Sequence, residues 1–485
     1  MVKNVKNIRS LVSKQSLLFL LKDIRFWIFL FAVIRLYGIT NPPLEVAHSW
    51  RQTTVTMVAR NFYEVDPNIL YPRIDIAEDM TGITGMEFPL LNYLVFLVSK
   101  LFGYNHWYGR LINLIVSSLG CWYFYRLLRK YFSERLAFAS AFLLTVSLWF
   151  SYSRKIMPDT FSMSLIIMGV YYGTNYLESA SHRFLHLLLY VLMTLMGLLS
   201  KLPSGYILVV FLLPMLDRKI QIQRKVVFVL FSVLLCVSVV WWYWYWVPYL
   251  VKEYGFWHFF MGKNMAVGAR ELLENWNDTL AHFYDEALKF IGFGIFLMGL
   301  IYCFIRKEKL ILRILGLGFM AFFVVMLKSG FTFAHHTYYV LPFVPVMALV
   351  AGYGVVVVNK AGLRVLLLTA VVLENVLNQK QDFTIHENRE SIVRLEEILD
   401  GFSQPSDLIV INSGEEPTPM YFAHRKGWVA YNEQLSDASF IDDIRQRGCQ
   451  YVVVLKRAFG SCMTMDLAVV FDSDDYTIYS LNRKD

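Results

Sequence analysis

Apolar runs of about twenty residues recur along this chain and decide what it can fold into. Two examples are FVLFSVLLCVSVVWWYWYWV (228–247) and HTYYVLPFVPVMALVAGYGVVVV (336–358). A helix of that length crosses a hydrocarbon core of about 30 Å, whereas a membrane β-barrel would show short alternating segments. Only 17% of the residues are charged, against about a quarter in soluble domains. The sequence therefore predicts a polytopic α-helical membrane protein.

Short basic clusters between the apolar runs predict which side of the membrane each loop faces. The strong clusters are RLLRKYFSER (126–135), DRKIQIQRK (217–225) and IRKEKLILR (305–313), and the weaker ones are ASHR (180–183) and NKAGLR (359–364). If all five face the cytoplasm with the basic amino terminus, the spans alternate consistently. About eleven transmembrane helices result, near 24–40, 109–126, 136–152, 160–177, 185–200, 203–216, 226–247, 288–304, 311–327, 338–358 and 363–378. The net charge of +8 is then explained by topology, and no nucleic-acid partner is expected.

One apolar segment, FPLLNYLVFLVSKLFG (88–103), does not fit this alternation. A span there would place the basic clusters on opposite sides, and the segment is short for a bilayer at about 1.5 Å per residue. We expect an interfacial or re-entrant helix within a large first outer loop, 41–108. Outer loops that hold their own helices are usually functional.

The composition changes from about residue 379. DLIVIN and QYVVVLK are typical of buried strands, and RESIVRLEEIL and DASFIDDIRQRG of amphipathic helices. The predicted domains are a transmembrane domain at 1–378 and a small periplasmic α/β domain at 379–485. The expected role of the second is to stabilise the protein or to guide the acceptor.

Charged and aromatic side chains gather on the predicted outer side, several of them next to apolar runs. Four of them also have a purely structural interpretation. Asp159 could cap a helix, Lys201 could extend its ammonium group to the membrane interface, and His335 and His336 could belong to an aromatic belt. A charge beside an apolar run is costly unless it is paired or functional. Their convergence on one face therefore indicates a candidate active site.

Seven stretches, taken in order, resemble a known family. They are HSWRQTTVTMVARNFYE, YPRID, EFPLLNYLVFLVSKLFG, GRLINLI, SRKIMPDTFSM, SKLPSG and HHTYYVLPFVP, within roughly residues 20–378. Their order and topology are similar to those of the C-type membrane glycosyltransferases. The chain most resembles bacterial relatives of the protein O-mannosyltransferase family and of the lipid A aminoarabinose transferase.

The resemblance implies transfer of a sugar, with inversion, from a polyprenyl-phosphate (undecaprenyl-type) carrier to an acceptor hydroxyl at the outer face. A phosphate leaving group needs cations around it, and the acceptor needs a base. The implied catalytic residues are Glu45, His48 and Asp159. The implied substrate-binding residues are Trp50, Arg51, Gln52, Arg60, Glu87, Arg110, Arg154, Lys155, Lys201, His335, His336, Tyr338 and Tyr339.

The sequence departs from the family at two positions. Relatives carry an acidic pair a few residues before an Ala-Arg, where this chain has Arg51 and Gln52, so the base falls to Glu45 or His48, with Glu45 slightly favoured. Relatives often have a lysine before the proline of the next motif, where this chain has Phe88. The phosphate contact would then come from Lys201 or an arginine.

No cofactor is required by this chemistry, although a divalent metal could bind. Glu87 with His335 or His336, joined by His258 or His282, would offer suitable ligands.

Two other functions remain open. A transporter or flippase for a lipid-linked glycan would also explain the spans and the cationic face, although transporters tend to place polar groups at mid-membrane. The second alternative is a polymerase or ligase that uses polyprenyl-linked glycans. The expected location is a bacterial inner membrane, and the expected partners are membrane lipids, the polyprenyl-phosphate sugar and an acceptor lipid, glycan or protein.

Overall fold

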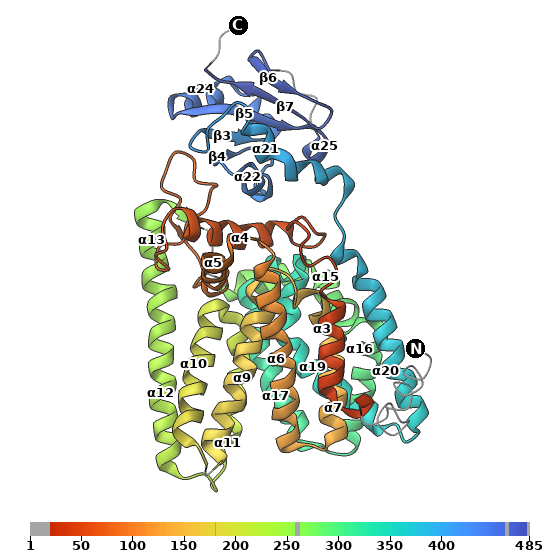
Figure 1. The fold of residues 1–485 in the computed structure, drawn as a ribbon. Helices are drawn as coiled ribbons and strands as arrows, with labels where there is room; N and C mark the ends of the chain where they lie inside the picture. Colours follow the sequence, from red (N-terminus) through yellow and green to blue (C-terminus); the bar gives the residue numbers. More distant parts are fainter. Residues whose placement is uncertain (1–19, 180, 258–261, 461–464, 483–485) are drawn as a thin grey trace, which may run out of the picture.

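A computed structural model describes residues 20–179, 181–257, 262–460 and 465–482. A bundle of helices carries a five-stranded sheet at one end (Figure 1). The described residues of the five basic clusters lie at the other end of the bundle, as the predicted alternation requires.

Helices occupy all eleven predicted spans. The main bundle helices are α3 (Ile24–Ile34), α6 (Tyr108–Tyr131), α7 (Glu134–Val146), α9 (Pro158–Glu178), α10 (Arg183–Ser200), the 3-10 helix η1 (Leu202–Phe211) with α11 (Leu212–Leu216), α12 (Ile222–Val240), α16 (Lys289–Ile305), α17 (Lys309–Ser329), the 3-10 helix η4 (Thr337–Phe343) with α19 (Val344–Val357), and α20 (Ala361–Asn378). Among the described residues, six helices are long and apolar enough to cross a membrane, or seven if one pair bent by 93° counts as a single span. The predicted number of eleven spans is therefore not confirmed. Some of the segments are short, such as the 11-residue α3.

Shorter elements join these helices. They are α8 (Trp149–Tyr152), the π-helix η2 (Trp241–Trp246) with α13 (Val247–Tyr254), α14 (Met265–Glu274), α15 (Trp276–Ala281), the π-helix η3 (His282–Ala287) and α18 (Phe331–His335). The strands β1 (Thr84–Gly85) and β2 (Phe256–Trp257) pair in parallel.

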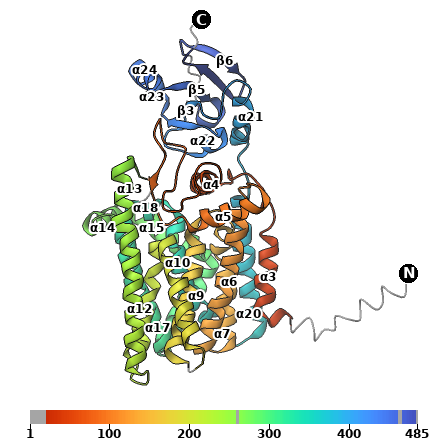
Figure 2. The same cartoon turned by 60° about the vertical axis from the view of Figure 1, so that its left-hand side comes forward.

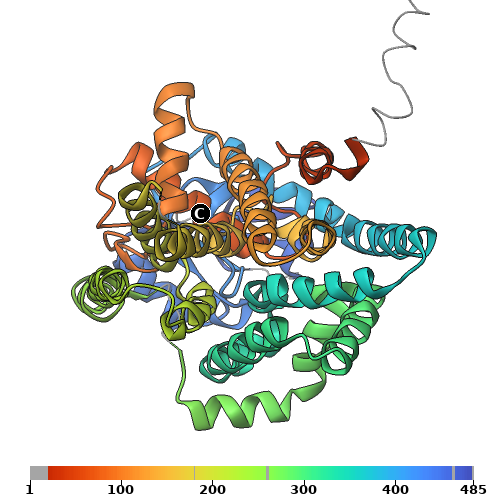
Figure 3. The ribbon, with the colours of Figure 1, turned by 90° about the horizontal axis from the view of Figure 1, so that it is seen from below.

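The bundle packs the two halves of the sequence side by side, the orange and yellow helices against the green and cyan ones (Figure 3). At its centre α19 is almost entirely buried and contacts both α7 and α16. Glycines permit the crossing of α16 and α19. A Cβ on Gly299 would overlap the carbonyl of Val350, and one on Gly354 would overlap that of Ile295.

Two helices of the loop after α3 lie across the end of the bundle, below the sheet (Figures 1 and 2). They are α4 (Ser49–Glu64) and α5 (Leu90–Phe102). The 13-residue α5 coincides with the apolar segment that we predicted not to span, and Asn92 ties it to α4 by donating to the carbonyl of Val55 (2.9 Å).

The C-terminal part is α/β, as predicted. Its sheet has the order β4-β3-β5-β7-β6, with β3 parallel to β4 and β5, and β7 antiparallel to β5 and β6. The strands are β3 (Leu408–Ile411), β4 (Lys426–Val429), β5 (Cys449–Leu455), β6 (Ala468–Asp472) and β7 (Tyr476–Ser480). The helices are η5 (Gln379–Phe383), η6 (Glu387–Arg394), α21 (Leu395–Leu399), α22 (Thr418–Ala423), α23 (Asn432–Leu435), α24 (Ala438–Gln446) and α25 (Lys456–Phe459). The predicted strands DLIVIN and QYVVVLK correspond to β3 and β5. The domain boundary at 378/379 stays a prediction.

The C-terminal part contacts α4 by means of its helix α22. Thr53 and Thr418 share a hydrogen bond (3.1 Å), and Arg60 donates to the carbonyl of Tyr421 (2.9 Å) while stacking on its ring. Arg60 also forms an ion pair with Asp75 (2.9 Å), which belongs to the same loop as α4. Polar contacts therefore fix the sheet over the loop that holds seven of the sixteen predicted site residues.

Candidate active site

Side chains from five separate segments meet at the end of the bundle that faces the sheet. We call this group the apical cluster. It contains His48, Arg51, Glu87, Tyr152, Asp159, Lys201, His336, Tyr338 and Tyr339. All of these except Tyr152 are among the residues that the sequence indicated.

Asp159 and Lys201 form the centre of the apical cluster. Asp159 lies in the first turn of α9, where Met157 is the N-cap residue, and its carboxylate pairs with Lys201 (3.1 Å) rather than capping the helix. Lys201, between α10 and η1, also lies over the rings of Tyr338 (5.1 Å) and Tyr339 (5.6 Å). Burial lowers the pKa of Lys201, and the charge of Asp159 opposes this shift.

The other oxygen of Asp159 is more unusual. Its Oδ2 atom is buried and accepts no hydrogen bond from any residue that the structure describes. A buried carboxylate oxygen without a donor is costly, and such groups occur where a ligand or water completes the site.

A second ion pair of the apical cluster joins Arg51, in the first turn of α4, to Glu87, just before α5. Glu87 is buried and Arg51 is half-buried. Neighbouring Gln52 is buried and accepts from the backbone amide of Ile156 (3.2 Å), which ties α4 to the segment before α9.

His48 lies among aromatic rings, 4.8 Å from Tyr338 and 5.8 Å from both Tyr152 and His336, measured between centroids. Burial, with the nearby charges of Lys155, His336 and Lys201, lowers its pKa to about 3. The imidazole is therefore neutral at neutral pH. Tyr152 joins this group by a hydrogen bond to Thr337 (2.5 Å), and nothing in the sequence distinguished it from other tyrosines at span ends.

Glu45 lies outside the apical cluster. Its carboxylate is 1% exposed and is held between Arg154 (2.6 Å) and Arg110 (3.2 Å). The two guanidinium groups also donate to backbone carbonyls of the turn after α3: Arg154 to Tyr37 and Gly38, and Arg110 to Ile39, Asn41 and Pro42. We call Glu45, Arg110 and Arg154 the buried triad. It fixes the path of the chain into the first loop.

Four other predicted site residues have contacts of different kinds. Lys155 is buried and donates to the carbonyls of Val46 (3.0 Å) and Asp382 (3.3 Å). Arg60 is engaged with Tyr421 and Asp75, as described above. Trp50 is 44% exposed at the start of α4, and exposed His335 stacks on Phe331.

The metal ligands considered from the sequence do not assemble. Glu87 pairs with Arg51, and buried His282 hydrogen-bonds to the carbonyl of Ala334 (3.1 Å). His258 lies outside the described residues. Within the described ranges, no three His, Cys, Asp or Glu side chains are grouped to hold a metal ion.

Comparison with solved structures defines the class of this fold. ArnT from Cupriavidus metallidurans bound to undecaprenyl phosphate superimposes with a TM-score of 0.61 at 11% identity, covering 94% of this chain and 98% of that one. Its apo state gives 0.59 at 13% identity, covering 94% and 97%. The Archaeoglobus fulgidus oligosaccharyltransferase complex with Zn and sulfate gives 0.57 at 15% identity, covering 89% of this chain and 68% of that one. The protein therefore has the fold of the C-type membrane glycosyltransferases.

Sequence comparison adds a narrower resemblance. The profile of the Dolichyl-phosphate-mannose-protein mannosyltransferase family matches residues 87–244, a segment that includes Glu87, Asp159 and Lys201. No curated protein matches the sequence significantly. The resemblance to the protein O-mannosyltransferase and aminoarabinose transferase relatives is thus confirmed.

Proposed function

We propose that the protein is an inverting glycosyltransferase that moves a sugar from a polyprenyl-phosphate donor to an acceptor hydroxyl. The observation that carries this proposal is the apical cluster. There two cations, Arg51 and Lys201, lie with the buried carboxylate of Asp159 at one end of a membrane bundle. The solved complex of ArnT with undecaprenyl phosphate, which shares the fold, supports the class of donor.

The cations suit the leaving group. When the acceptor oxygen attacks the anomeric carbon, the bond from that carbon to the phosphate oxygen breaks and the polyprenyl phosphate departs as an anion. Arg51 and Lys201 would bind that anion, because positioned cations stabilise charge that develops in a water-poor site. Glu87 and Asp159 hold these two side chains in place before the donor arrives.

Asp159 is the base that the geometry favours. Its Oδ2 atom has no donor among the described residues and could accept the proton of the acceptor hydroxyl. Both oxygens of Glu45 are occupied by the buried triad, which argues against the earlier preference for Glu45. A pKa of about 3 makes His48 a weak base, so we assign it to orienting substrate.

An apolar groove of about 900 Å³ would accept part of the polyprenyl chain. Its walls come from α14 to α17 and include Leu272, Trp276, Phe283 and Phe319. Phe343 also lines the groove and belongs to η4, the same helix that supplies Tyr338 and Tyr339 to the apical cluster. Long apolar chains bind in such grooves through the area they remove from solvent.

The location follows from the charges of the turns. Basic turns lie at the end away from the sheet, so the positive-inside rule would place the apical cluster and the sheet on the periplasmic side of a bacterial inner membrane. The sheet, docked on α4, would stabilise the first loop or guide the acceptor. We assign no metal to the reaction. The transfer assay described below identifies the sugar and the class of acceptor.

The test is a transfer assay in membranes with a panel of radiolabelled undecaprenyl-phosphate sugars. We expect wild-type membranes to transfer label from at least one donor, and Asp159→Asn to reduce the rate by about 10²-fold or more. Glu178→Gln, at the other end of α9, is the matched control and should transfer normally. Movement of the donor across the membrane without transfer would instead support the flippase, and extension of a lipid-linked glycan would support the polymerase or ligase.

A further inference from the structure

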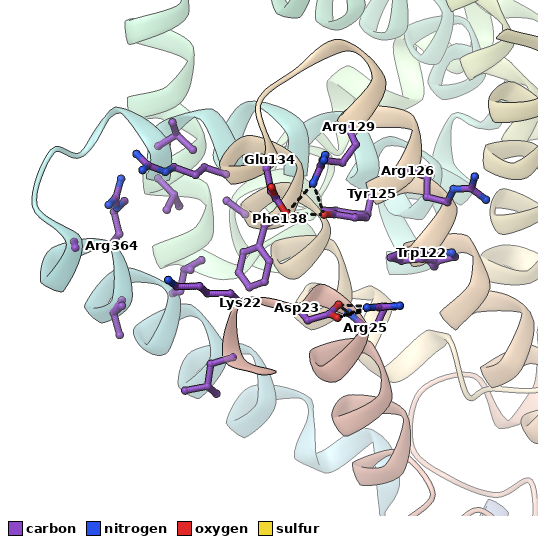
Figure 4. Close-up of a pocket in the computed structure, with 18 of the residues that line it drawn as sticks. Lys22, Asp23, Arg25, Trp122, Tyr125, Arg126, Arg129, Glu134, Phe138 and Arg364 are labelled. Carbon is purple, nitrogen blue, oxygen red and sulfur yellow. Dashed lines mark hydrogen bonds and ion pairs between the residues drawn. The ribbon is translucent and has the colours of Figure 1, made fainter. Parts of the chain in front are cut away.

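A large cavity lies at the end of the bundle away from the apical cluster. It has a volume of about 1280 Å³ and is formed by the beginnings of α3, α7 and α20 and the end of α6 (Figure 4). We call it the basal pocket. Ligand pockets commonly measure about 300–1,000 Å³, so this one has room for a headgroup with more than one phosphate.

Cations dominate the lining of the basal pocket. Seven basic side chains and two carboxylates line it: Lys22, Arg25, Arg126, Arg129, Lys130, Arg135 and Arg364, with Asp23 and Glu134. Arg25 is paired with Asp23 (2.6 Å), Arg129 with Glu134 (2.8 Å) and Lys130 with Glu178 (2.8 Å). Within the described ranges, Lys22, Arg126, Arg135 and Arg364 have no carboxylate within ion-pair distance.

This excess of charge differs from a merely topogenic cluster because it surrounds one cavity. The cations come from three stretches that are distant in sequence: the start of α3 with Lys22 just before it, the end of α6 with the start of α7, and the start of α20. Figure 4 shows Lys22, Arg25, Arg126, Arg129 and Arg364 among the side chains that line the pocket. Arg126 is further held by stacking on Tyr171 (4.6 Å), which reduces the entropy lost when it binds an anion.

The apolar part of the lining indicates what kind of anion fits. Leu21, Trp122, Phe138, Val365 and Leu368 line the same cavity, and Val365 is 64% exposed on the outer side of α20. An anion that carried acyl chains could therefore place its phosphate among the arginines and its chains along α20. Basic pockets between transmembrane helices on the cytoplasmic side are typical sites for multiply charged phospholipid headgroups.

We propose that the basal pocket binds the headgroup of an anionic phospholipid, and binds a lipid with two phosphates more tightly than one with a single phosphate. This site is separate from the apical cluster and does not depend on the proposed transfer reaction.

The test is retention of lipid by the full-length protein in detergent, measured by native mass spectrometry. The protein is offered an equimolar mixture of cardiolipin, phosphatidylglycerol and phosphatidylcholine. We expect retention in the order cardiolipin, phosphatidylglycerol, phosphatidylcholine. Equal retention of all three lipids would overturn the proposal without any variant.

A variant with Arg126→Gln, Arg135→Gln and Arg364→Gln should bind cardiolipin on the order of a hundredfold more weakly, because each basic side chain near an anionic headgroup contributes about a fivefold factor. The matched control carries Arg218→Gln, Lys219→Gln and Lys309→Gln, which remove the same charge from exposed positions outside the pocket. Equal losses in both proteins would overturn the proposal. Changing the same three pocket arginines to lysine should keep most of the binding, which guards against misfolding of the glutamine variant.

A last arm separates a lipid from a soluble phosphate compound. Glycerol 3-phosphate is titrated against the cardiolipin-bound protein, and we expect no displacement at millimolar concentration. Displacement there would show that the pocket takes a soluble phosphate, and would overturn the assignment to a lipid.

Discussion

Lys201 Nζ lies 3.1 Å from Asp159 Oδ1, and this ion pair joins the start of α9 to the turn after α10. Both side chains are largely buried, at 14% and 3% exposure. Removing one member of a buried pair leaves an uncompensated charge, which costs about 3–5 kcal/mol. We therefore expect Lys201→Met to lower the free energy of unfolding by that amount and to abolish transfer, as measured by thermal unfolding in detergent and by the transfer assay.

The double variant Asp159→Asn/Lys201→Met separates folding from function. It removes both charges, so most of the lost stability should return while transfer stays absent. Recovery of transfer in the double variant would contradict the roles assigned to both residues.

The buried triad predicts a different result for Glu45. Glu45→Gln leaves Arg110 and Arg154 facing a neutral amide in the interior, and we expect a loss of at least about 3 kcal/mol of stability. The measurement is the yield and melting temperature of the purified protein. A variant that folded like the wild type but transferred no sugar would instead identify Glu45 as the base.

Much of this fold could be predicted from the sequence. The apolar runs gave the helical segments, because their length and hydropathy are set by the membrane rather than by tertiary contacts. The alternation of basic clusters placed Asp159, Lys201 and His336 at the same end of the bundle. The structure brings these three side chains together in the apical cluster. The predicted strands DLIVIN and QYVVVLK correspond to β3 and β5 because buried strands are short, apolar and bounded by turns.

The pairing of charges could not be predicted. Glu45 meets Arg154 across 109 positions of sequence, and such contacts depend on how helices pack rather than on local pattern. The same holds for Arg60, which the resemblance implied as a substrate-binding residue and whose contact with Tyr421 of the C-terminal part no local pattern indicated. The sequence indicates which cations lie near the ends of the apolar runs but not which of them are already paired.

The contacts of Glu87 predict how the proposed transfer reaction responds to chelators. Because its carboxylate is paired with Arg51, and because no three-residue metal group occurs within the described ranges, we expect transfer to stay within about twofold of its initial rate in excess EDTA. The measurement is initial rate before and after dialysis against EDTA. Loss of transfer that Zn²⁺ or Mg²⁺ restored would contradict this prediction.

His424 predicts how the docking of the sheet depends on pH. Its ring bridges Glu396 of α21 and Glu64 of α4 (2.8 Å to Glu64), and these hydrogen bonds raise its pKa to about 9, against the opposing effects of burial and of Arg60. Glu396 belongs to the same C-terminal part as His424, so only the hydrogen bond to Glu64 depends on docking, and it stabilises the imidazolium further in the docked state. Its contribution is fully present below pH 6.5, the ordinary pKa, and is lost as pH rises towards about 9.

We expect the pair with Glu64 to contribute up to about 1 kcal/mol to docking, since both side chains are about one-third exposed and solvent screens the interaction. Limited proteolysis between η5 and α21 measures the docking, and cleavage should accelerate between pH 6.5 and 9.5 in the wild type. His424→Gln should be cleaved at the faster rate across that range, because the amide carries no charge to lose. The control Arg447→Gln removes a different ion pair to the same loop, with Glu78 and Asp79. This variant should be cleaved faster than the wild type at every pH, and its cleavage should still accelerate between pH 6.5 and 9.5. A wild-type cleavage rate that did not depend on pH would show that His424 does not govern docking.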